Sequence, residues 1–450
     1  MPTVVDRARD RLGAGGAVVL LVAGAGVAVA ITAYARRYGF AGLAVDRAAV
    51  RGWLDGTGLY GYRSPDTHLG TAQPPPAAIL LTPLAVLPLA VSGWVVSITG
   101  VAALVLAMIA LAGPVARRYG RRRWPAVFAG TALALAVAPV RAALGLGELD
   151  LVLFGLITAD VVALRRAAWA RSRAAWWPGR PASARRLGRP PEPPLRRAWR
   201  NGSWAGVGTG LATAVAVSPA LFIAYLAVTR QWRAAMTALA TASALSTAAV
   251  LVAPHETRAW LGQVLFRLDR TGPIDRPGNQ SLAGVLARLY DSGTAPLLLW
   301  FAFALLLVAV GMIRARTAHA EGDEIVAFTL VGLTSAIVGP VTDTYELIWV
   351  LPAMLILVDV AARRRGETRR PRTVDHRAGW GTALAAGLAY LLFLTDPGWT
   401  GGIGANAHAI AVILLVNALP WRPGVAPALP VYRLAAPSRP IPPARRPTGS

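Results

Sequence analysis

Two residue types are missing from this sequence, cysteine and lysine. Without cysteine the chain has no disulfide framework, no thiol nucleophile and no cysteine-based zinc site. Its 5 histidines are too scattered to indicate a metal cluster. The sequence also lacks a GK[ST] phosphate loop, an HExxH motif and a serine nucleophile elbow. ATP-driven chemistry and the common hydrolase sites are therefore not expected.

Charge is scarce as well, and acidic charge most of all. Only 15% of the 450 residues are charged, with 22 acidic against 46 basic side chains, and 55% are hydrophobic. The arginines fall in short blocks between long apolar runs, which is not the even basic surface of a nucleic-acid-binding protein. This pattern is typical of a polytopic membrane protein. Since about 20 apolar residues span a bilayer, a dozen spans would use roughly half of the chain.

The apolar runs predict an all-α fold with about twelve membrane segments. They lie at 14–33, 92–113, 126–139, 149–164, 203–229, 236–253, 296–313, 325–339, 346–362, 380–395 and 404–420. Arginine blocks resist translocation, so the connections at 117–123, 165–200 and 363–377 should be cytoplasmic. All three agree only if the run at 203–229 breaks near Ser218-Pro219 into two short helices. Both termini of this plasma-membrane protein are then cytoplasmic.

This topology gives a single membrane domain over residues 1–420, followed by a disordered cytoplasmic tail at 421–450. Two long loops, 35–90 and 255–295, should face outward. The Arg- and Pro-rich loop 165–200 should be cytoplasmic and poorly ordered. Within the first outer loop, the apolar stretch from Pro74 to Pro88 is too short for an ordinary span and is predicted to be re-entrant.

Carboxylates near apolar spans are costly and are therefore functional candidates. Those on the predicted outer face are Asp46, Asp55, Glu148, Asp150, Asp343, Glu346 and Asp396. Such a group suits a general base that removes a proton from a hydroxyl. It equally suits proton or cation binding in a transporter. The plainest alternative is that each carboxylate only marks a water-exposed helix end.

Several stretches, in this order along the chain, carry a resemblance. They are Ala44-Val45 through Gly56 with Leu59-Tyr60, Pro74-Pro75 through Pro83-Leu84-Ala85, Pro139-Val140-Arg141 through Gly147, Ser218-Pro219 with Trp232-Arg233-Ala234-Ala235, Gly278-Asn279-Gln280-Ser281 with Arg288, and Trp349 to Pro352. Together they resemble the family-87 glycosyltransferases, multi-spanning mannosyltransferases of actinobacteria that use polyprenyl phosphate mannose. An arginine-only, alanine-rich composition fits a GC-rich genome of that kind.

The resemblance implies a GT-C-like fold, a polyprenyl phosphate sugar donor, a lipid or glycan acceptor, and an acid of the first outer loop as base. The family pattern places that acid where this chain has Gly42, whereas Asp46 follows four residues later. Further departures are Gln73 for a tyrosine, Glu148 and Asp150 for amides, Ala216 for a lysine, and 342–346 for a Ser-Trp-x-His-His stretch.

These departures replace basic and neutral side chains by acids, so a donor phosphate needs compensation from arginine or a cation. We predict Asp46 as the base, with Asp343 and Glu346 as rivals. The predicted substrate-binding residues are Arg47, Gln73, Arg141, Glu148, Asp150, Asn279, Gln280 and Tyr345. Arg276 is a further candidate for charge compensation. No metal site or cofactor is expected, although a divalent cation is conceivable, and no nucleic-acid partner is expected.

Three functions remain open on the sequence. The first is hexosyl transfer, with mannose as the sugar, from a polyprenyl phosphate to an acceptor on the outer face. The second is a catalytically inactive relative that acts as a binding or assembly partner in envelope glycan synthesis. The third is a carboxylate-coupled transporter.

Overall fold

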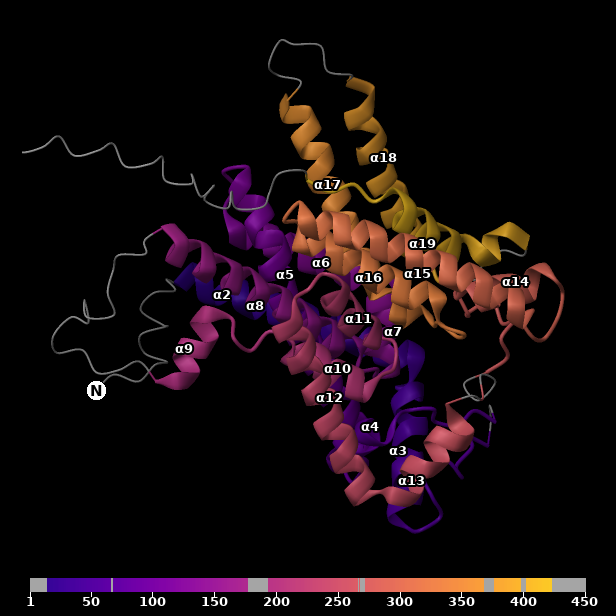
Figure 1. Cartoon of the computed structure of the whole chain (residues 1–450). Helices are drawn as coiled ribbons and strands as arrows, with labels where there is room; N and C mark the ends of the chain where they lie inside the picture. The colour runs from indigo at the N-terminus through magenta and orange to yellow at the C-terminus, as the bar shows by residue number, and fades with distance from the viewer. Residues whose placement is uncertain are drawn as a thin grey trace, which may run out of the picture.

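The computed structural model describes residues 14–65, 68–176, 193–265, 267, 272–367, 376–397 and 402–422, and every regular element in these ranges is a helix (Figure 1). The helices are α2 (Ala14–Tyr38), α3 (Ala41–Leu54), α4 (Pro75–Ala85), α5 (Leu89–Arg118), α6 (Arg123–Ala136), α7 (Ala138–Leu146), α8 (Asp150–Trp176), α9 (Pro194–Asn201), α10 (Val207–Val215), α11 (Ala220–Val228), α12 (Trp232–Val252), α13 (Pro254–Ala259), the π-helix η1 (Trp260–Val264), α14 (Leu282–Leu289), α15 (Leu297–Ala320), α16 (Glu324–Val338), the 3-10 helix η2 (Thr344–Trp349), α17 (Val350–Glu367), α18 (His376–Phe393), the 3-10 helix η3 (Gly402–Asn406) and α19 (Ala407–Ala418). The predicted all-α class is confirmed.

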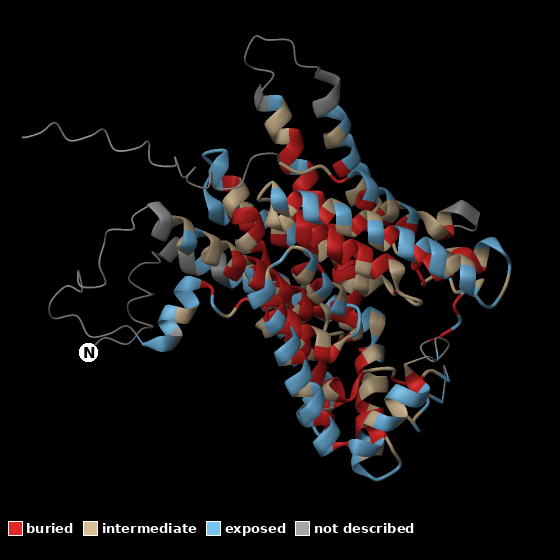
Figure 2. Cartoon of the chain, viewed as in Figure 1, coloured by how far each residue is buried: buried red, intermediate tan, exposed pale blue. Residues whose placement is uncertain are grey.

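Long helices pack in pairs around one apolar core. The closest pairs are α15 with α16, α17 with α18, α10 with α12, and α5 with α6 and α8. Buried residues concentrate where these pairs meet, and the outward faces of α12, α15 and α18 are exposed (Figure 2). Helix α16 is the central element. It is apolar on all sides, as a buried helix should be, and most of its side chains are buried.

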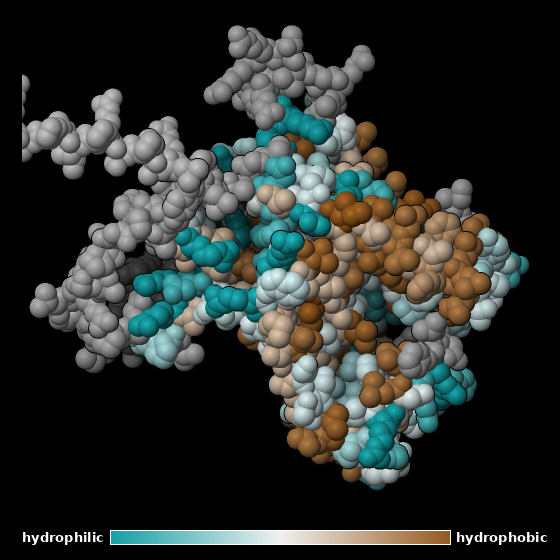
Figure 3. All heavy atoms as spheres, in the orientation of Figure 1, coloured by the Kyte–Doolittle hydropathy of each residue, from teal (hydrophilic) through white to brown (hydrophobic). Residues whose placement is uncertain are grey.

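The exposed face of α15 is as apolar as a lipid-facing surface requires. Leu297, Leu298, Phe301, Leu305 and Leu306 are each more than half exposed. Figure 3 shows hydrophobic surface over α15, of the kind that soluble proteins rarely leave in water. The chain is therefore a membrane protein.

Within the described residues, four helices are long and apolar enough to cross a membrane, and a bent pair adds a fifth. They are Leu89–Arg118, Trp232–Val252, Leu297–Ala320 and Thr344–Arg365, with Arg123–Ala136 and Ala138–Leu146 bent by 72°. Shorter apolar helices are Pro75–Ala85, Glu324–Val338, Trp380–Phe393 and Gly404–Ala418. The predicted count of about twelve segments and the re-entrant loop remain predictions.

Two connections bear directly on the sequence predictions. The run at 203–229 does break as predicted, since α10 ends at Val215 and α11 begins at Ala220. The predicted cytoplasmic loop at 165–200 is helical where it is described, because α8 continues to Trp176 and α9 covers Pro194–Asn201. Alanine and arginine favour this continuation. The predicted tail at 421–450 lies outside the described residues, apart from Trp421 and Arg422.

The two predicted outer loops contain helices and come together at one end of the molecule. Helices α3 and α4 of the first loop pack on each other, and α4 also contacts α10 and α12. Helix α13 follows α12 at the same end, and together these elements form the lobe below the bundle in Figure 1. Glu256 of α13 accepts a hydrogen bond from the Leu59 backbone at 3.2 Å, which ties the two loops together.

Candidate active site

A cavity of about 1320 Å³ lies between the first predicted outer loop and the helix bundle. Its walls come from the start of α3, the segment before α4, the α7–α8 turn, the α10–α11 break, and the segment between α16 and η2. In Figure 3 the surface is hollowed between α15 and the lobe below it. Segments far apart in sequence therefore meet at one site of a size that ligand sites have.

Acids outnumber bases among the charged residues of the described lining. The charged lining residues are Asp46, Glu148, Asp150, Asp343, Glu346 and Asp396, with Arg276 as the basic one. Gln73 and Tyr345 also line the cavity. The structure thus brings together the three predicted base candidates and four of the predicted substrate-binding residues. Of the acids named as candidates, Asp55 lies apart from this lining, at the end of α3.

Asp46 projects from the second turn of α3. Its carboxylate accepts hydrogen bonds from the segment that leads into α4. The Gln73 amide donates to its Oδ2 at 3.5 Å, and the Thr71 hydroxyl also hydrogen-bonds to it. Burial raises the pKa of Asp46 to about 6, although these two hydrogen bonds act in the opposite direction. The carboxylate therefore titrates near neutral pH.

Glu148 stands in the short turn between α7 and α8, in the middle of the acidic group. Burial raises the pKa of Glu148 well above its ordinary value, and the charges of Asp46, Asp150, Asp343 and Glu346 add to the effect. Carboxylates packed in this way cannot all be ionised at once. The site therefore holds protons that carboxylates in water would release.

Arg276 offsets part of this charge through a bidentate pair with Asp343. Its Nη2 lies 2.8 Å from Oδ1 and 2.9 Å from Oδ2, and the Tyr345 hydroxyl lies 3.4 Å from the same Oδ2. Burial raises the pKa of Asp343, while the Arg276 guanidinium opposes that shift. Asp343 is thereby engaged by protein groups, which leaves it less available as a base.

Asn279 and Gln280, two predicted substrate-binding residues, are fully buried and do not line the cavity. The Asn279 amide donates to Ile274 O at 2.8 Å and accepts from Thr342 N at 2.9 Å. Gln280 donates to Ala405 O at 2.8 Å and accepts from Ala409 N at 3.1 Å. The Asn279 side chain fastens the second predicted outer loop to the segment that leads to Asp343, and the Gln280 side chain fastens it to η3 and α19.

Arg47 is likewise a structural residue in this geometry. It is 6% exposed, and its guanidinium donates to the carbonyls of Leu84, Ala85 and Leu87 at the end of α4. The last carbonyls of a helix need such donors because they have no partner within the helix. Arg47 therefore joins α4 to α3 and lies outside the cavity lining.

Arg141, the remaining predicted substrate-binding residue, lies at the cavity edge. It donates to Leu394 O at 2.9 Å and to Asp396 Oδ1 at 3.2 Å, while its buried Nε has no partner. Arg37 forms a second ion pair with Asp396, and the Tyr38 hydroxyl lies 3.4 Å from it. Two guanidinium groups thus share one lining carboxylate, which leaves net positive charge at this edge.

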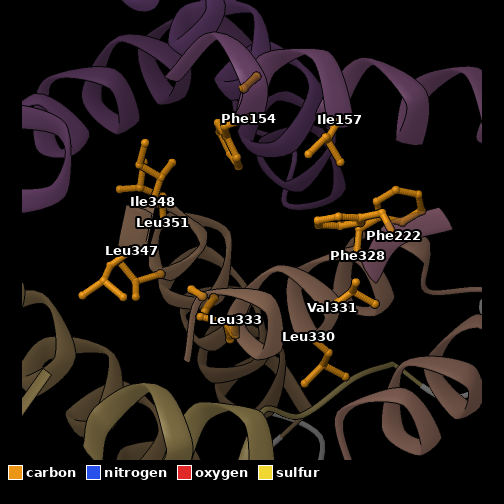
Figure 4. Close-up of a cluster of buried hydrophobic side chains, with 14 of the residues drawn as sticks. Phe154, Ile157, Phe222, Phe328, Leu330, Val331, Leu333, Leu347, Ile348 and Leu351 are labelled. Atoms are coloured by element: carbon orange, nitrogen blue, oxygen red, sulfur yellow. The ribbon is translucent and has the colours of Figure 1, made fainter. Parts of the chain in front are cut away.

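Apolar side chains form the wall opposite the acidic group. Those in the lining include Leu221 of α11, Trp300 and Val308 of α15, and Val338 of α16. Beneath Asp150 and Glu346 a small pocket reaches an aromatic cluster, in which Phe222 packs on Trp349 at 5.0 Å and on Phe328 at 5.6 Å between ring centroids. Figure 4 shows Phe222 and Phe328 facing each other within this core. The cavity lining therefore combines charged and apolar side chains.

Among the described residues, no group of three or more histidine, aspartate or glutamate side chains is arranged to hold a metal ion.

Comparison with known families decides the classification. The model of glycosyltransferase family 87 matches residues 73–340. The chain belongs to glycosyltransferase family 87. That match includes Gln73, the α7–α8 turn with Glu148 and Asp150, and the loop with Arg276, and it ends just before Asp343. The resemblance identified from the sequence is therefore confirmed.

Relatives of known activity support the same classification. One is the polyprenol-phosphate-mannose-dependent alpha-(1-2)-phosphatidylinositol mannoside mannosyltransferase of Mycobacterium tuberculosis, 27% identical over 76% of both chains. A second is the corresponding pentamannoside mannosyltransferase of that species, 27% identical over 81% of this chain and 76% of the relative. A third is the Mycolicibacterium smegmatis mannosyltransferase, 27% identical over 77% of this chain and 73% of the relative. No solved structure matches the chain.

Proposed function

We propose that this protein is a membrane mannosyltransferase that uses polyprenyl phosphate mannose and glycosylates a hydroxyl of a lipid or glycan acceptor. The observation that carries the proposal is the cavity that combines carboxylates with an apolar wall, in a chain of family 87. Its relatives are named for this donor and for phosphatidylinositol mannoside acceptors. The residues described favour neither a transporter nor an inactive binding partner by any specific feature.

The apolar wall suits the polyprenyl chain of the donor. Leu221, Val308 and Val338 line the cavity, and Val308 belongs to the same helix as the exposed leucines of α15. A lipid in the bilayer can therefore enter beside α15 without leaving an apolar environment. Its charged head then meets the polar end of the cavity.

The donor phosphate fits best at the edge where Arg37 and Arg141 share Asp396. A phosphodiester anion placed among Glu148, Asp150 and Glu346 would be repelled, and Arg276 is already neutralised by Asp343. At the edge, two arginines face one carboxylate, and arginine binds phosphate through paired N–H donors. The mannose attached to that phosphate then points toward the acids, whose oxygens accept hydrogen bonds from sugar hydroxyls.

The reaction follows from this placement. The acceptor oxygen attacks the anomeric carbon from the face opposite the phosphate, the new carbon–oxygen bond forms, and the bond to the phosphate oxygen breaks. Polyprenyl phosphate leaves with the electron pair, and the configuration inverts. The acceptor's proton passes to a carboxylate of the cavity, as general base catalysis requires.

This chemistry takes place at the outer face in the proposed topology. The two predicted outer loops supply Asp46, Gln73 and Arg276, while the arginine-rich connections lie at the opposite membrane surface. We place the protein in the plasma membrane with both termini cytoplasmic.

Transfer can be measured with the purified full-length protein in lipid vesicles, polyprenyl phosphate carrying radiolabelled mannose, and a membrane lipid extract that contains phosphatidylinositol mannosides. We expect labelled glycolipid to accumulate at the same rate with EDTA as with added Mg²⁺. Arg141→Ala should raise the KM for the donor much more than the KM for the acceptor. No labelled product from folded protein, or proton-driven uptake of a solute instead, would overturn the proposal.

A further inference from the structure

In the cavity wall, the Glu148 carboxylate fills the space that a side chain at position 42 would need. A Cβ atom placed on Gly42 would overlap Oε1 of Glu148, and it would lie 3.0 Å from Cδ of Glu148 and 3.3 Å from Leu146 O. Gly42 lies in the first turn of α3. Its φ is not positive, so the backbone does not require glycine here. The reason for glycine at this position is spatial: it leaves room for the Glu148 carboxylate.

Asp46 lies one helical turn after Gly42 on the same face of α3. Residues four apart in a helix have Cβ atoms about 5–6 Å apart, so a carboxylate over Gly42 is next to Asp46. Both side chains line the cavity, and the charge of Asp46 is the strongest of the four that act on Glu148. The α7–α8 turn thus delivers a carboxylate to the surface of α3.

Hydrogen bonding distinguishes Glu148 from Asp46 and Asp343. Asp46 is held by Thr71 and Gln73, and Asp343 is held by Arg276. The Glu148 carboxylate makes no hydrogen bond to any residue in the described ranges, although its backbone N–H donates to Ala143 O at 2.9 Å. Its oxygens therefore remain available for a ligand that enters the cavity.

Asp150 and Glu346 are the rivals on this criterion. Both also line the small pocket at the aromatic cluster, next to Trp349, whereas Glu148 lines only the main cavity. The charges that act on Glu148 come from Asp46, Asp150, Asp343 and Glu346, which makes Glu148 the meeting point of the acidic group. Burial and the neighbouring charges raise the pKa of Glu148, and a carboxylate with a higher pKa is a stronger base.

We propose that Glu148 is the catalytic base of the mannosyl transfer and that Gly42 is kept small so that the Glu148 carboxylate can lie over α3. This inference rests on the proposed function. In the reaction, a Glu148 oxygen takes the proton of the acceptor hydroxyl while the acceptor oxygen bonds to the anomeric carbon. The electron pair of the broken carbon–oxygen bond leaves with polyprenyl phosphate, and Glu148 later releases its proton to water.

The first test is Glu148→Gln, which keeps the shape of the side chain and removes its basicity. We expect kcat to fall by about 10²–10⁴-fold, while the donor KM changes by less than about threefold and the thermal midpoint is retained. If the variant keeps a kcat within about threefold of the wild-type value, Glu148 is not the base. Wild-type protein that transfers no mannose contradicts the proposed function instead, so the two failures are distinguishable.

The second test moves the carboxylate from one residue to the other. Gly42→Ala should lower kcat because the added methyl group displaces Glu148, whereas Gly387→Ala should not, because a Cβ at that exposed helix position meets nothing within 4 Å. Glu148→Ala empties the space, and Gly42→Asp in the same chain returns a carboxylate to it from α3. We expect the double variant to be at least about tenfold faster than Glu148→Ala. A folded double variant no faster than Glu148→Ala would overturn the proposal.

Discussion

At the scale of single residues, the site is defined by buried acids that interact through their charges. Asp46, Glu148 and Asp343 all have a pKa raised by burial, and only Asp343 has an arginine against it. Removing one negative charge from such a group changes the titration of the others. The coupling between Asp46 and Glu148 can therefore be read from a pH profile.

Asp46→Asn should shift the acidic limb of the kcat/KM profile to lower pH. The Asp46 charge raises the pKa of Glu148, so its removal lets Glu148 ionise in more acidic solution. We expect a decrease in the maximal rate smaller than that of Glu148→Gln, because Asp46 acts on the neighbouring base through its charge and does not take the proton. Rates of mannose transfer between pH 5 and 8 measure this. A complete loss of transfer at every pH would instead assign the base to Asp46, as the sequence alone suggested.

Stability should decrease as the pH rises. A carboxyl group whose pKa is higher in the folded than in the unfolded protein binds more protons when folded, so it stabilises the fold at low pH and loses that contribution as pH rises through its folded value. For Asp46 that value is about 6. The thermal midpoint in detergent should thus be several degrees higher at pH 5 than at pH 8. The difference should shrink in Asp46→Asn and stay unchanged in Asp55→Asn, which alters an exposed acid.

Residue identity alone predicted part of this site. The acids Asp46, Glu148, Asp150, Asp343 and Glu346 stood out because ionisable groups are rare in this chain, and all five line the cavity. Asn279 and Gln280 were predicted as ligands of the substrate, yet their amides hold backbone groups together. An amide serves either role equally well, so its sequence position cannot distinguish them. The close approach of the Glu148 carboxylate to Gly42 depends on how the α7–α8 turn packs on α3, so no local sequence pattern indicates it.

At the scale of helices, the start of the short helix α10 is stabilised from a neighbouring helix. The Asp160 carboxylate of α8 is 1% exposed and accepts hydrogen bonds from Gly208 N at 3.3 Å and Thr209 N at 2.6 Å. These are first-turn N–H groups of α10, which have no partner within the helix and which favour a negative charge. Asp160 thus caps a short helix from outside it.

Asp160→Ala should lower the thermal midpoint of the protein by several degrees. Loss of an N-cap side chain costs about 0.5–2 kcal/mol, and the buried N–H groups left behind would have no replacement. The KM for the donor should change little, because Asp160 lies outside the cavity lining. Asp55→Ala provides the control on an exposed acid. Equal midpoints for the two variants would contradict this role for Asp160.

Helix boundaries were predictable where the sequence carries a local signal. Ser218-Pro219 indicates the break in the run at 203–229. Proline has no backbone N–H to donate within a helix, and its ring clashes with the carbonyl of the preceding turn. The bend between α6 and α7 was not predicted, although Pro139 stands just after it. Its run was read as one span, since hydrophobicity was continuous across Val137. Periodicity reports burial, but it does not report the direction in which a helix leaves a bend.

At the scale of the whole molecule, the absence of cysteine makes the membrane topology simple to measure. Single cysteines placed at exposed positions of the active wild-type sequence can be labelled without any background. Thr57→Cys and Thr294→Cys, in the two predicted outer loops, should react with a membrane-impermeant maleimide on intact cells. Arg197→Cys in α9 should react only after the membrane is permeabilised. Labelling of all three on intact cells would contradict the proposed orientation.

The account as a whole depends on one claim, that this family-87 protein transfers mannose and uses the acids of its cavity to do so. The most direct measurement is the rate at which purified protein in vesicles moves radiolabelled mannose from polyprenyl phosphate mannose to a phosphatidylinositol mannoside, for the wild type beside Glu148→Gln. We predict transfer by the wild type and a rate at least about 100-fold lower for the variant. Equal rates for the two proteins would contradict the role given to the cavity acids, and no transfer by folded wild-type protein would contradict the function itself.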